Sequence, residues 1–341
     1  MSFDIEIRPS GHRFQAEPGE TILDAAERQG ITLPYGCRNG MCGTCAGTLV
    51  SGSVRYPDEV QEAMEGRPED QCLTCQAVPA SDLSLVIHEV EGAREIEVRT
   101  FPCRVDEKQR LAHDVERVYL KLPDGQRLQF LAGQYLDFLL EDGRRRAFSI
   151  ANAPHDDERI ELHIRHVPGG EFTEYVFERM QVGDILSVQA PMGGFYLRED
   201  SDRPLILMAG GTGFAPLKAI IEHAFHLGIE RPMHLYWGVR SESDLYLPEL
   251  PLQWAEQKAF FQYTPVLSEP GDDWSGRTGW VHEAVVADYP DMAPFDLYMS
   301  GPPPMVFAGR EAFLAAGLDE SHMYSDVFEW AKDGNRKEAT A

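Results

Sequence analysis

Five of the six cysteines in this 341-residue chain fall between Cys37 and Cys75, and their spacing limits what this segment can fold into. Cys37, Cys42 and Cys45 are spaced C-x4-C-x2-C inside the glycine-rich run PYGCRNGMCGTCAG, and Cys75 follows thirty positions later. This is the plant-type [2Fe–2S] spacing, in which four thiolates converge on two irons. The glycines permit the left-handed and close-approach conformations that wrapping a cluster needs. We therefore predict a [2Fe–2S] cluster with Cys37, Cys42, Cys45 and Cys75 as its ligands.

A zinc site is the competing interpretation of the same cysteines. Cys42-x2-Cys45 and Cys72-x2-Cys75 could be the two C-x2-C pairs of a zinc ribbon. That interpretation leaves Cys37 unused and gives no reason for the glycines, so the cluster is favoured. Cys72 is then a neighbour of the cluster and not one of its ligands.

Charge, hydropathy and the first residues narrow the remaining classes of function. The formal net charge is −25, so nucleic acid and anionic membrane are poor partners. No apolar run approaches the roughly 20 residues that a membrane span needs. The first ten residues alternate apolar and charged side chains, which is typical of an edge strand and not of a signal peptide. We expect a cytoplasmic, monomeric protein that binds neither nucleic acid nor membrane.

Three segments differ in their patterns. Residues 1–92 combine a hairpin, a short helix and the cysteine loop. Residues 93–200 hold short alternating runs broken by Asp-Gly and Gly-Gly turns, which predict an antiparallel barrel or sandwich. Residues 201–341 alternate strands and helices, the pattern of a doubly wound parallel sheet. Helices are predicted over residues 21–29, 57–66, 173–180, 216–227, 281–287 and 304–316.

The run Arg146-Ala147-Phe148-Ser149 ends a basic stretch on a predicted strand. A guanidinium can pair with a pyrophosphate in a bidentate way, Phe148 offers a flat apolar wall, and the Ser149 hydroxyl can hydrogen-bond a ring nitrogen. The run resembles the R-x-Y/F-S element of the ferredoxin–NADP reductase superfamily, which lies along the flavin. The resemblance implies that all four residues contact a flavin, with Ser149 beside the hydride-accepting nitrogen.

A second element, the run GGEFT, follows a predicted strand and opens a helix. Backbone N–H groups at a helix N-terminus bind pyrophosphate. The run is similar to the superfamily's G-x-x-S/T element, which implies that Gly170 and Thr173 contact the flavin diphosphate. His163, Arg165 and His166 stand where the family contacts the flavin, its diphosphate or its adenine. Members with this domain order mostly carry FAD, and FMN is the alternative.

Two further elements resemble the nicotinamide-binding part of the same superfamily. AGGTGFAP follows a buried strand and resembles the GGTGxAP element, while SGPPPM resembles CGPPPM. Ser300 stands where the family frequently has a cysteine; a hydroxyl can still touch the nicotinamide, although the hydride-transfer rate would change. The contacts that these two elements imply are Gly211, Thr212, Gly213, Ser300, Gly301, Pro302 and Met305.

The choice between NADH and NADPH is predicted from the end of the strand at residues 234–238. A 2′-phosphate would need several bases, and only Arg240 is available there. Glu242 and Asp244 would repel the phosphate and could bond a free 2′-hydroxyl, so we predict NADH. Near the C-terminus, the run YSDVF resembles the family's last stretch, and Phe328 is the predicted cover of the flavin ring.

The resemblance covers about residues 1–330 and rests on four motifs in the same order. It implies a multidomain protein of α+β and α/β class. The expected parts are a β-grasp ferredoxin-like domain at 1–92, an antiparallel β-barrel flavin domain at 93–200 and a doubly wound parallel-sheet nicotinamide domain at 201–341. The order resembles the reductase components of bacterial multicomponent oxygenases (phenol hydroxylase, methane monooxygenase, benzoate dioxygenase) and CDP-6-deoxy-3,4-glucoseen reductase.

The resemblance implies that a hydride passes from NADH to FAD, and that single electrons then pass to the cluster and on to an oxygenase or sugar-dehydrase partner. Flavin is stable in one- and two-electron states, so it must stand between the two. Two other functions stay open: a flavin reductase that releases reduced flavin, and an electron-transfer module active only in a tight complex. We expect the partner at the face around Arg38–Met41, with the acidic residues at 58–70 as a second candidate.

Overall fold

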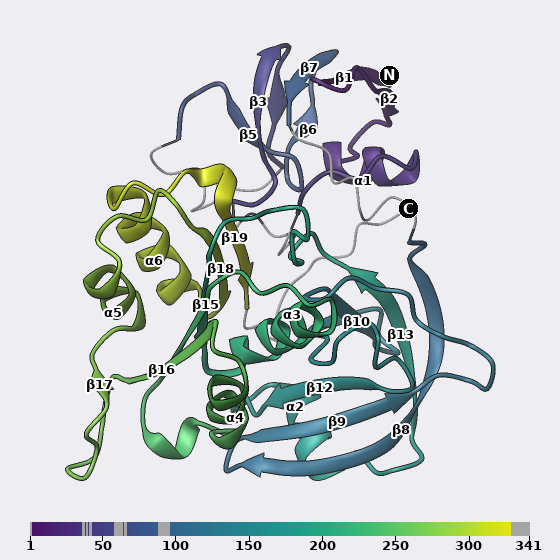
Figure 1. Ribbon diagram of the computed structural model, residues 1–341. Helices are drawn as coiled ribbons and strands as arrows, with labels where there is room; N and C mark the ends of the chain where they lie inside the picture. Colours follow the sequence, from purple (N-terminus) through teal and green to yellow (C-terminus); the bar gives the residue numbers. More distant parts are fainter. Residues whose placement is uncertain are drawn as a thin grey trace.

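Three large sheets make up the part of the chain that the computed structural model describes, which is residues 2–35, 38, 40, 43–57, 64, 67–87 and 96–328 (Figure 1). The N-terminal sheet has the order β2-β1-β7-β3-β5, and β1 runs parallel to β7. The Thr21 hydroxyl caps the predicted short helix by accepting from Asp24 N at 3.1 Å. The predicted helix at 57–66 lies almost entirely outside the described residues. The elements are β1 Phe3–Arg8, β2 Arg13–Ala16, α1 Ile22–Arg28, β3 Ala46–Ser51, β4 Val54–Arg55, β5 Gln71–Leu73, β6 Val78–Pro79 and β7 Leu83–Val86.

The second sheet is an antiparallel barrel with the order β11-β10-β13-β8-β9-β12. An isolated bridge between Ile150 and Leu162 joins its two ends. Inward-facing aliphatic and aromatic side chains, among them Phe138 and Phe172 with ring centroids 4.8 Å apart, fill its core. The elements are β8 Arg99–Ala112, β9 Val115–Lys121, β10 Tyr135–Leu139, β11 Arg145–Ser149, β12 Ile160–Arg165, α2 Glu171–Glu178 and β13 Ile185–Met192.

The third sheet is parallel throughout, with the order β17-β16-β15-β14-β18-β19. Its central strands, β14, β15 and β18, are buried on both faces, which is why their sequences are mostly apolar. The strand order reverses beside β14, and such switch points bind ligands at the carboxyl ends of the strands. The elements are β14 Leu205–Gly210, α3 Phe214–His226, β15 Met233–Val239, α4 Glu249–Gln257, β16 Phe261–Leu267, β17 Arg277–Thr278, α5 Val281–Asp288, β18 Asp296–Gly301, α6 Pro303–Ala315 and β19 Met323–Val327.

The three sheets fall inside the three predicted segments, and the predicted fold class is confirmed. The N-terminal sheet lies above the other two in Figure 1, close to both the barrel and β19. Helix α4, which lies in a stretch of mixed pattern, was not among the predicted helices. No helix in the described ranges combines the length and apolar character needed to cross a bilayer.

Candidate functional site

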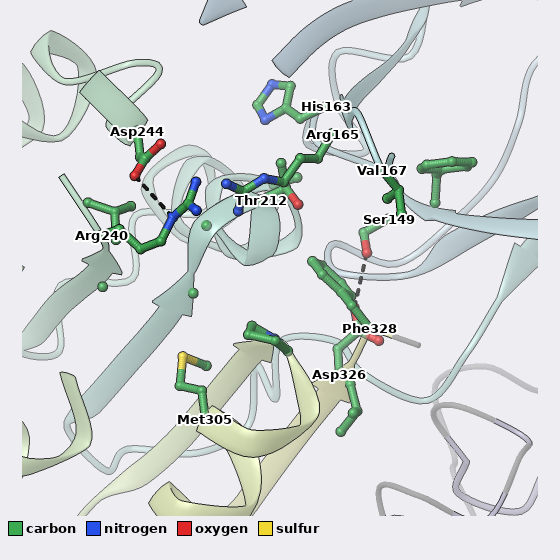
Figure 2. Close-up of a pocket in the computed structure, with 18 of the residues that line it drawn as sticks. Ser149, His163, Arg165, Val167, Thr212, Arg240, Asp244, Met305, Asp326 and Phe328 are labelled. Carbon is green, nitrogen blue, oxygen red and sulfur yellow. Dashed lines mark hydrogen bonds and ion pairs between the residues drawn. The ribbon is translucent and has the colours of Figure 1, made fainter. Parts of the chain in front are cut away.

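A large cavity opens where the barrel meets the carboxyl ends of the parallel strands. Its volume is about 490 Å³, and its walls come from both sheets (Figure 2). The sequence elements that predicted cofactor contacts therefore meet in one place, although they are separated by up to about half of the chain. The predicted contacts that line the cavity are Arg146, Ala147, Phe148, Ser149, His163, Arg165, Gly170, Thr173, Gly211, Thr212, Arg240, Pro302, Met305 and Phe328.

Four predicted contacts lie behind this wall and do not line the cavity: His166, Gly213, Ser300 and Gly301. Gly213 packs so tightly that a Cβ there would stand 1.9 Å from the Ser300 carbonyl oxygen. The Ser300 side chain is fully buried, and its hydroxyl has no hydrogen-bond partner among the described residues. The His166 ring instead packs against Phe177 on the barrel, with centroids 4.9 Å apart. Gly213 and Ser300 therefore hold the glycine turn against β18.

Ser149 and Asp326 meet on the cavity wall, one from the barrel and one from β19. The Ser149 hydroxyl donates to Asp326 Oδ2 at 3.0 Å, and both side chains are buried (Figure 2). Phe328 follows on the same strand end, where its backbone N–H donates to Gly301 O at 2.9 Å. Phe328 was predicted from the run YSDVF, whereas Asp326 was not among the predicted contacts. The available signal was nearness in sequence, because Asp326 lies two residues before the predicted contact Phe328, and both line the cavity.

The barrel side of the cavity carries positive charge and a helix N-terminus. The Arg165 guanidinium lies so close to the glycine turn that a Cβ on Gly211 would stand 2.9 Å from one of its nitrogens. Its Nε donates to Asp114 at 2.6 Å, which fixes its direction. The Thr173 hydroxyl accepts from Val167 N at 3.1 Å and donates to Gly170 O at 3.0 Å. This hydroxyl therefore shapes the turn ahead of α2.

At the far end of the cavity, Arg240 lies against Asp244. Arg240 Nε is 3.6 Å from Asp244 Oδ2, and the Arg240 side chain is 60% exposed (Figure 2). Asp244 Oδ2 also accepts from the Ser241 backbone N–H at 3.0 Å. Burial opposes ionisation of Asp244, but the hydrogen bond from Ser241 and the charge of Arg240 outweigh it and lower its pKa. A fixed carboxylate therefore stands at the end of β15 where the adenosine ribose was predicted.

A buried polar network crosses from the barrel to the parallel-sheet domain behind the cavity. Lys218 Nζ donates to Glu161 Oε2 at 3.1 Å and to Glu222 Oε2 at 2.9 Å. Glu161 Oε1 lies 2.8 Å from His163 Nε2, and His163 Nδ1 lies 3.0 Å from the Tyr246 hydroxyl. Burial lowers the pKa of His163 despite Glu161. A neutral His163 therefore donates from Nε2 to the carboxylate and accepts at Nδ1 from Tyr246.

The network predicts a specific dependence of stability on pH. Burial disfavours ionised Glu161, but His163 and Lys218 outweigh it and lower its pKa from 4.5 to about 2. A lowered pKa gives stability that is complete above pH 4.5 and is lost as the pH falls toward 2. Glu161→Gln should therefore flatten this acid limb in urea unfolding followed by tryptophan fluorescence. All five tryptophans lie beyond residue 236, so the signal reports the third domain. An unchanged limb would contradict this assignment.

The described cysteines of the N-terminal domain converge in part. Cys45 Sγ and Cys75 Sγ are 3.2 Å apart and both side chains are buried. The other two predicted ligands, Cys37 and Cys42, lie outside the described residues. Cys72 is fully buried in the core of the same domain, and burial raises the pKa of its thiol to about 12. Two thiols as close together as those of Cys45 and Cys75 are suited to bind the same metal centre.

Two residues of the predicted partner face, Arg38 and Gly40, lie within the described part of the chain. Arg38 lines a cleft between α1 and the barrel, together with Arg145 and Gln189. Its guanidinium lies 4.4 Å from the centroid of the Tyr35 ring. Asn39 and Met41 lie outside the described residues. Arg38 therefore lies in a cleft beside the protein's own barrel with 28% of its side chain exposed, and its role at a partner face stays a prediction.

The cavity and the thiol pair suit a dinucleotide site and a metal cluster. The cavity combines apolar walls with the guanidinium groups of Arg146 and Arg165, which can face phosphates. Three family models match the chain: a "2Fe-2S iron-sulfur cluster binding domain" at residues 5–80, an "Oxidoreductase FAD-binding domain" at 102–196 and an "Oxidoreductase NAD-binding domain" at 207–311.

Two relatives align along nearly their whole length. The CDP-6-deoxy-L-threo-D-glycero-4-hexulose-3-dehydrase reductase of Yersinia pestis is 36% identical over 96% of this chain and 99% of its own. The reductase component 2 of Comamonas terephthalate 1,2-dioxygenase is 35% identical over 98% of this chain and 100% of its own. The chain belongs to the three-domain [2Fe–2S]/flavin/nicotinamide reductases of the ferredoxin–NADP reductase superfamily.

The fold supports the same assignment. The crystal structure of the Amycolatopsis cytochrome P450 reductase GcoB superposes with a TM-score of 0.76 at 34% identity, covering 96% of this reductase and 98% of that chain. The N-terminal domain of this reductase is thus an iron–sulfur domain, and the zinc-ribbon alternative is set aside. The reductase uses FAD and a nicotinamide dinucleotide, and it transfers electrons from the nicotinamide toward a protein partner.

Proposed function

We propose that this reductase takes a hydride from NADH at the cavity between its second and third domains and delivers single electrons through the cluster to an oxygenase or a dehydrase. The observation that carries the proposal is that one cavity is lined by both nucleotide-binding domains, while its Asp326 wall adjoins the cluster-binding domain. The names of the two relatives supply the partner classes. We also propose that the protein is monomeric and cytoplasmic, and that its domain boundaries lie near residues 92 and 200.

The roles proposed for the cavity residues follow from their chemistry. Arg146 and Arg165 would hold the pyrophosphate of FAD, with the N-terminus of α2 beside them. Ser149, which donates its proton to Asp326, would accept a hydrogen bond from the ring edge, and Phe328 would cover the ring. Thr212 and Met305 would shape the nicotinamide side. When bound, the flavin exchanges two electrons with the nicotinamide and one at a time with the cluster; the chain's residues supply position and exclude water.

An anaerobic titration with NADH tests the proposal. Half an equivalent should begin to bleach the visible bands of the flavin and cluster, and a rhombic signal from the reduced cluster should appear in electron paramagnetic resonance. A flavin reductase would lose its flavin on gel filtration, whereas we expect FAD to stay bound. A module active only in a tight complex would not reduce cytochrome c alone, whereas we expect this reductase to do so. A protein that NADH leaves fully oxidised would refute the proposal.

Asp244 is the residue proposed to select NADH. A 2′-phosphate placed near this carboxylate would meet a fixed negative charge, while a free 2′-hydroxyl could donate to it. We expect Asp244→Ala to narrow the preference for NADH, measured as the ratio of kcat/KM for NADH and NADPH, by roughly tenfold, because one such interaction contributes about 1.4 kcal/mol. Glu256→Ala, which removes an exposed acidic side chain on α4 of the same domain, is the control. A preference for NADPH in the wild-type protein would overturn the assignment.

A further inference from the structure

The N-terminal domain contacts the barrel through a pair of backbone hydrogen-bond donors. Gly193 and Gly194 follow β13, and their N–H groups both point at Tyr35, two residues before the first predicted cluster ligand. Gly194 N donates to Tyr35 O at 2.7 Å, and Gly193 N donates to the Tyr35 hydroxyl at 3.2 Å. Tyr35 is 6% exposed. One tyrosine is therefore held at both its backbone and its side chain by the same turn.

The absence of side chains in this turn is what lets the two domains meet. A Cβ on Gly194 would stand 2.9 Å from Tyr35 O and 3.1 Å from Tyr35 N. The third nearest atom, at 3.7 Å, is the Cα of Pro34 in the same segment. Those atoms are backbone and cannot rotate away. The φ angle of Gly194 lies outside the left-handed region, so its own conformation does not require glycine. Glycine is required at position 194 because the backbone of the cluster domain lies too close for a side chain.

The other end of the cysteine loop also reaches the cavity wall. Thr44, next to the ligand Cys45, has its hydroxyl 3.5 Å from both the carbonyl and the hydroxyl oxygen of Ser325. Neighbouring residues of a strand point to opposite faces. Ser325 therefore faces the cluster domain, while Asp326 faces the cavity and bonds Ser149. On the barrel side, Tyr135 lines the cavity and would meet a Cβ on Gly193 at 2.8 Å.

We propose that the Gly193–Gly194 turn is the docking contact that holds the cluster domain against the wall of the flavin cavity. The position that this contact gives the cluster domain sets the rate of electron transfer from flavin to cluster. The residues act by position, since neither glycine touches a reacting atom. Of the two described flanks of the cysteine loop, Tyr35 contacts the turn that packs against Tyr135 of the cavity wall, and Thr44 contacts Ser325, the neighbour of Asp326 in that wall. The proposal rests on the order of electron flow given under the proposed function.

The variant Gly194→Ala, studied in the complete holoprotein, tests this docking contact. The added methyl group can be accommodated only by moving the Tyr35 segment away, so the step from flavin to cluster should slow several-fold, because the rate of electron transfer falls steeply as the two redox groups move apart. Reduction of the flavin by NADH, followed separately by stopped-flow absorbance, should stay within about twofold because the cavity keeps its own residues. Gly271→Ala is the control, since a Cβ there meets nothing within 4 Å.

Hydrogen exchange gives a readout that does not depend on turnover. The amides of Gly193 and residue 194 are bonded to Tyr35, so exchange in a peptide spanning the turn should accelerate in Gly194→Ala. Tyr35→Phe, which removes only the hydroxyl that accepts from Gly193, should accelerate exchange less and slow the flavin-to-cluster step less. Faster exchange with an unchanged flavin-to-cluster rate would overturn the proposal, and so would an equal slowing of both electron steps. Failure of the wild-type protein to oxidise NADH would instead refute the proposed function.

Discussion

Replacing Cys75 with serine is expected to abolish the cluster while leaving reduction of the flavin by NADH nearly unchanged. The cluster needs four thiolates, and the serine hydroxyl is a far weaker donor to iron at neutral pH. Cys75 Sγ lies 3.2 Å from the Sγ of a second predicted ligand, Cys45. Iron and acid-labile sulfide should fall to near zero, and reduction of cytochrome c should be lost. Reduction of bound FAD, measured by stopped-flow absorbance, should stay within about twofold because the cavity is untouched.

Cys72→Ala is the matched control, because Cys72 is also fully buried and lies three positions away. It should keep its iron, its sulfide and its visible colour. Cys72 lies outside the C-x4-C-x2-C…C spacing that supplies the four predicted ligands, so its thiol is expected to pack in the core without binding iron. A Cys72→Ala protein that loses iron in proportion to Cys75→Ser would show that the ligand set is wrong.

The sequence was sufficient wherever a local rule has a unique structural consequence. The cysteine spacing predicted the iron–sulfur domain, and the glycine turn before Pro216 predicted the start of α3 within two residues of Phe214. Alternating runs predicted the antiparallel barrel. These features depend on period, turn chemistry and ligand spacing, which are properties of short segments.

The sequence was insufficient wherever two distant segments meet. Asp326 lies 177 positions from Ser149, and nothing in either run indicates that the two side chains share a hydrogen bond. Ser300 was expected at the nicotinamide, but the structure places it behind the cavity wall, because β18 is buried on both faces. Arg38 was expected at a partner face, yet it lies in the cleft against the barrel. Long-range packing decided each of these positions, and single-segment patterns do not encode it.

Lys218→Met is expected to be the most destabilising of the single changes considered. Lys218 is 7% exposed, and it is the only described ammonium that bonds both Glu161 and Glu222. Removing it leaves the buried Glu161 carboxylate with the hydrogen bond from His163 at 2.8 Å and an Arg117 nitrogen at 3.9 Å. Breaking one partner of a buried pair costs about 3–5 kcal/mol in comparable cases. The free energy of unfolding of the third domain, measured by urea titration with tryptophan fluorescence, should fall by that amount. Arg127→Met is the control, since the exposed pair of Arg127 with Asp157 should contribute less than about 1 kcal/mol.

The double variant Lys218→Met with Glu161→Gln distinguishes an unpaired charge from lost packing. If the cost comes from the stranded Glu161 carboxylate, neutralising it should restore most of the stability, because the Glu222 side chain is 27% exposed and can reach water. If the cost comes from the cavity left by the lysine stem, the double variant should be no more stable than the single one. Methionine nearly matches the stem in volume, so restoration is the expected outcome. The buried network would then link the flavin and nicotinamide domains through a single lysine, whose charge balances the carboxylates around it.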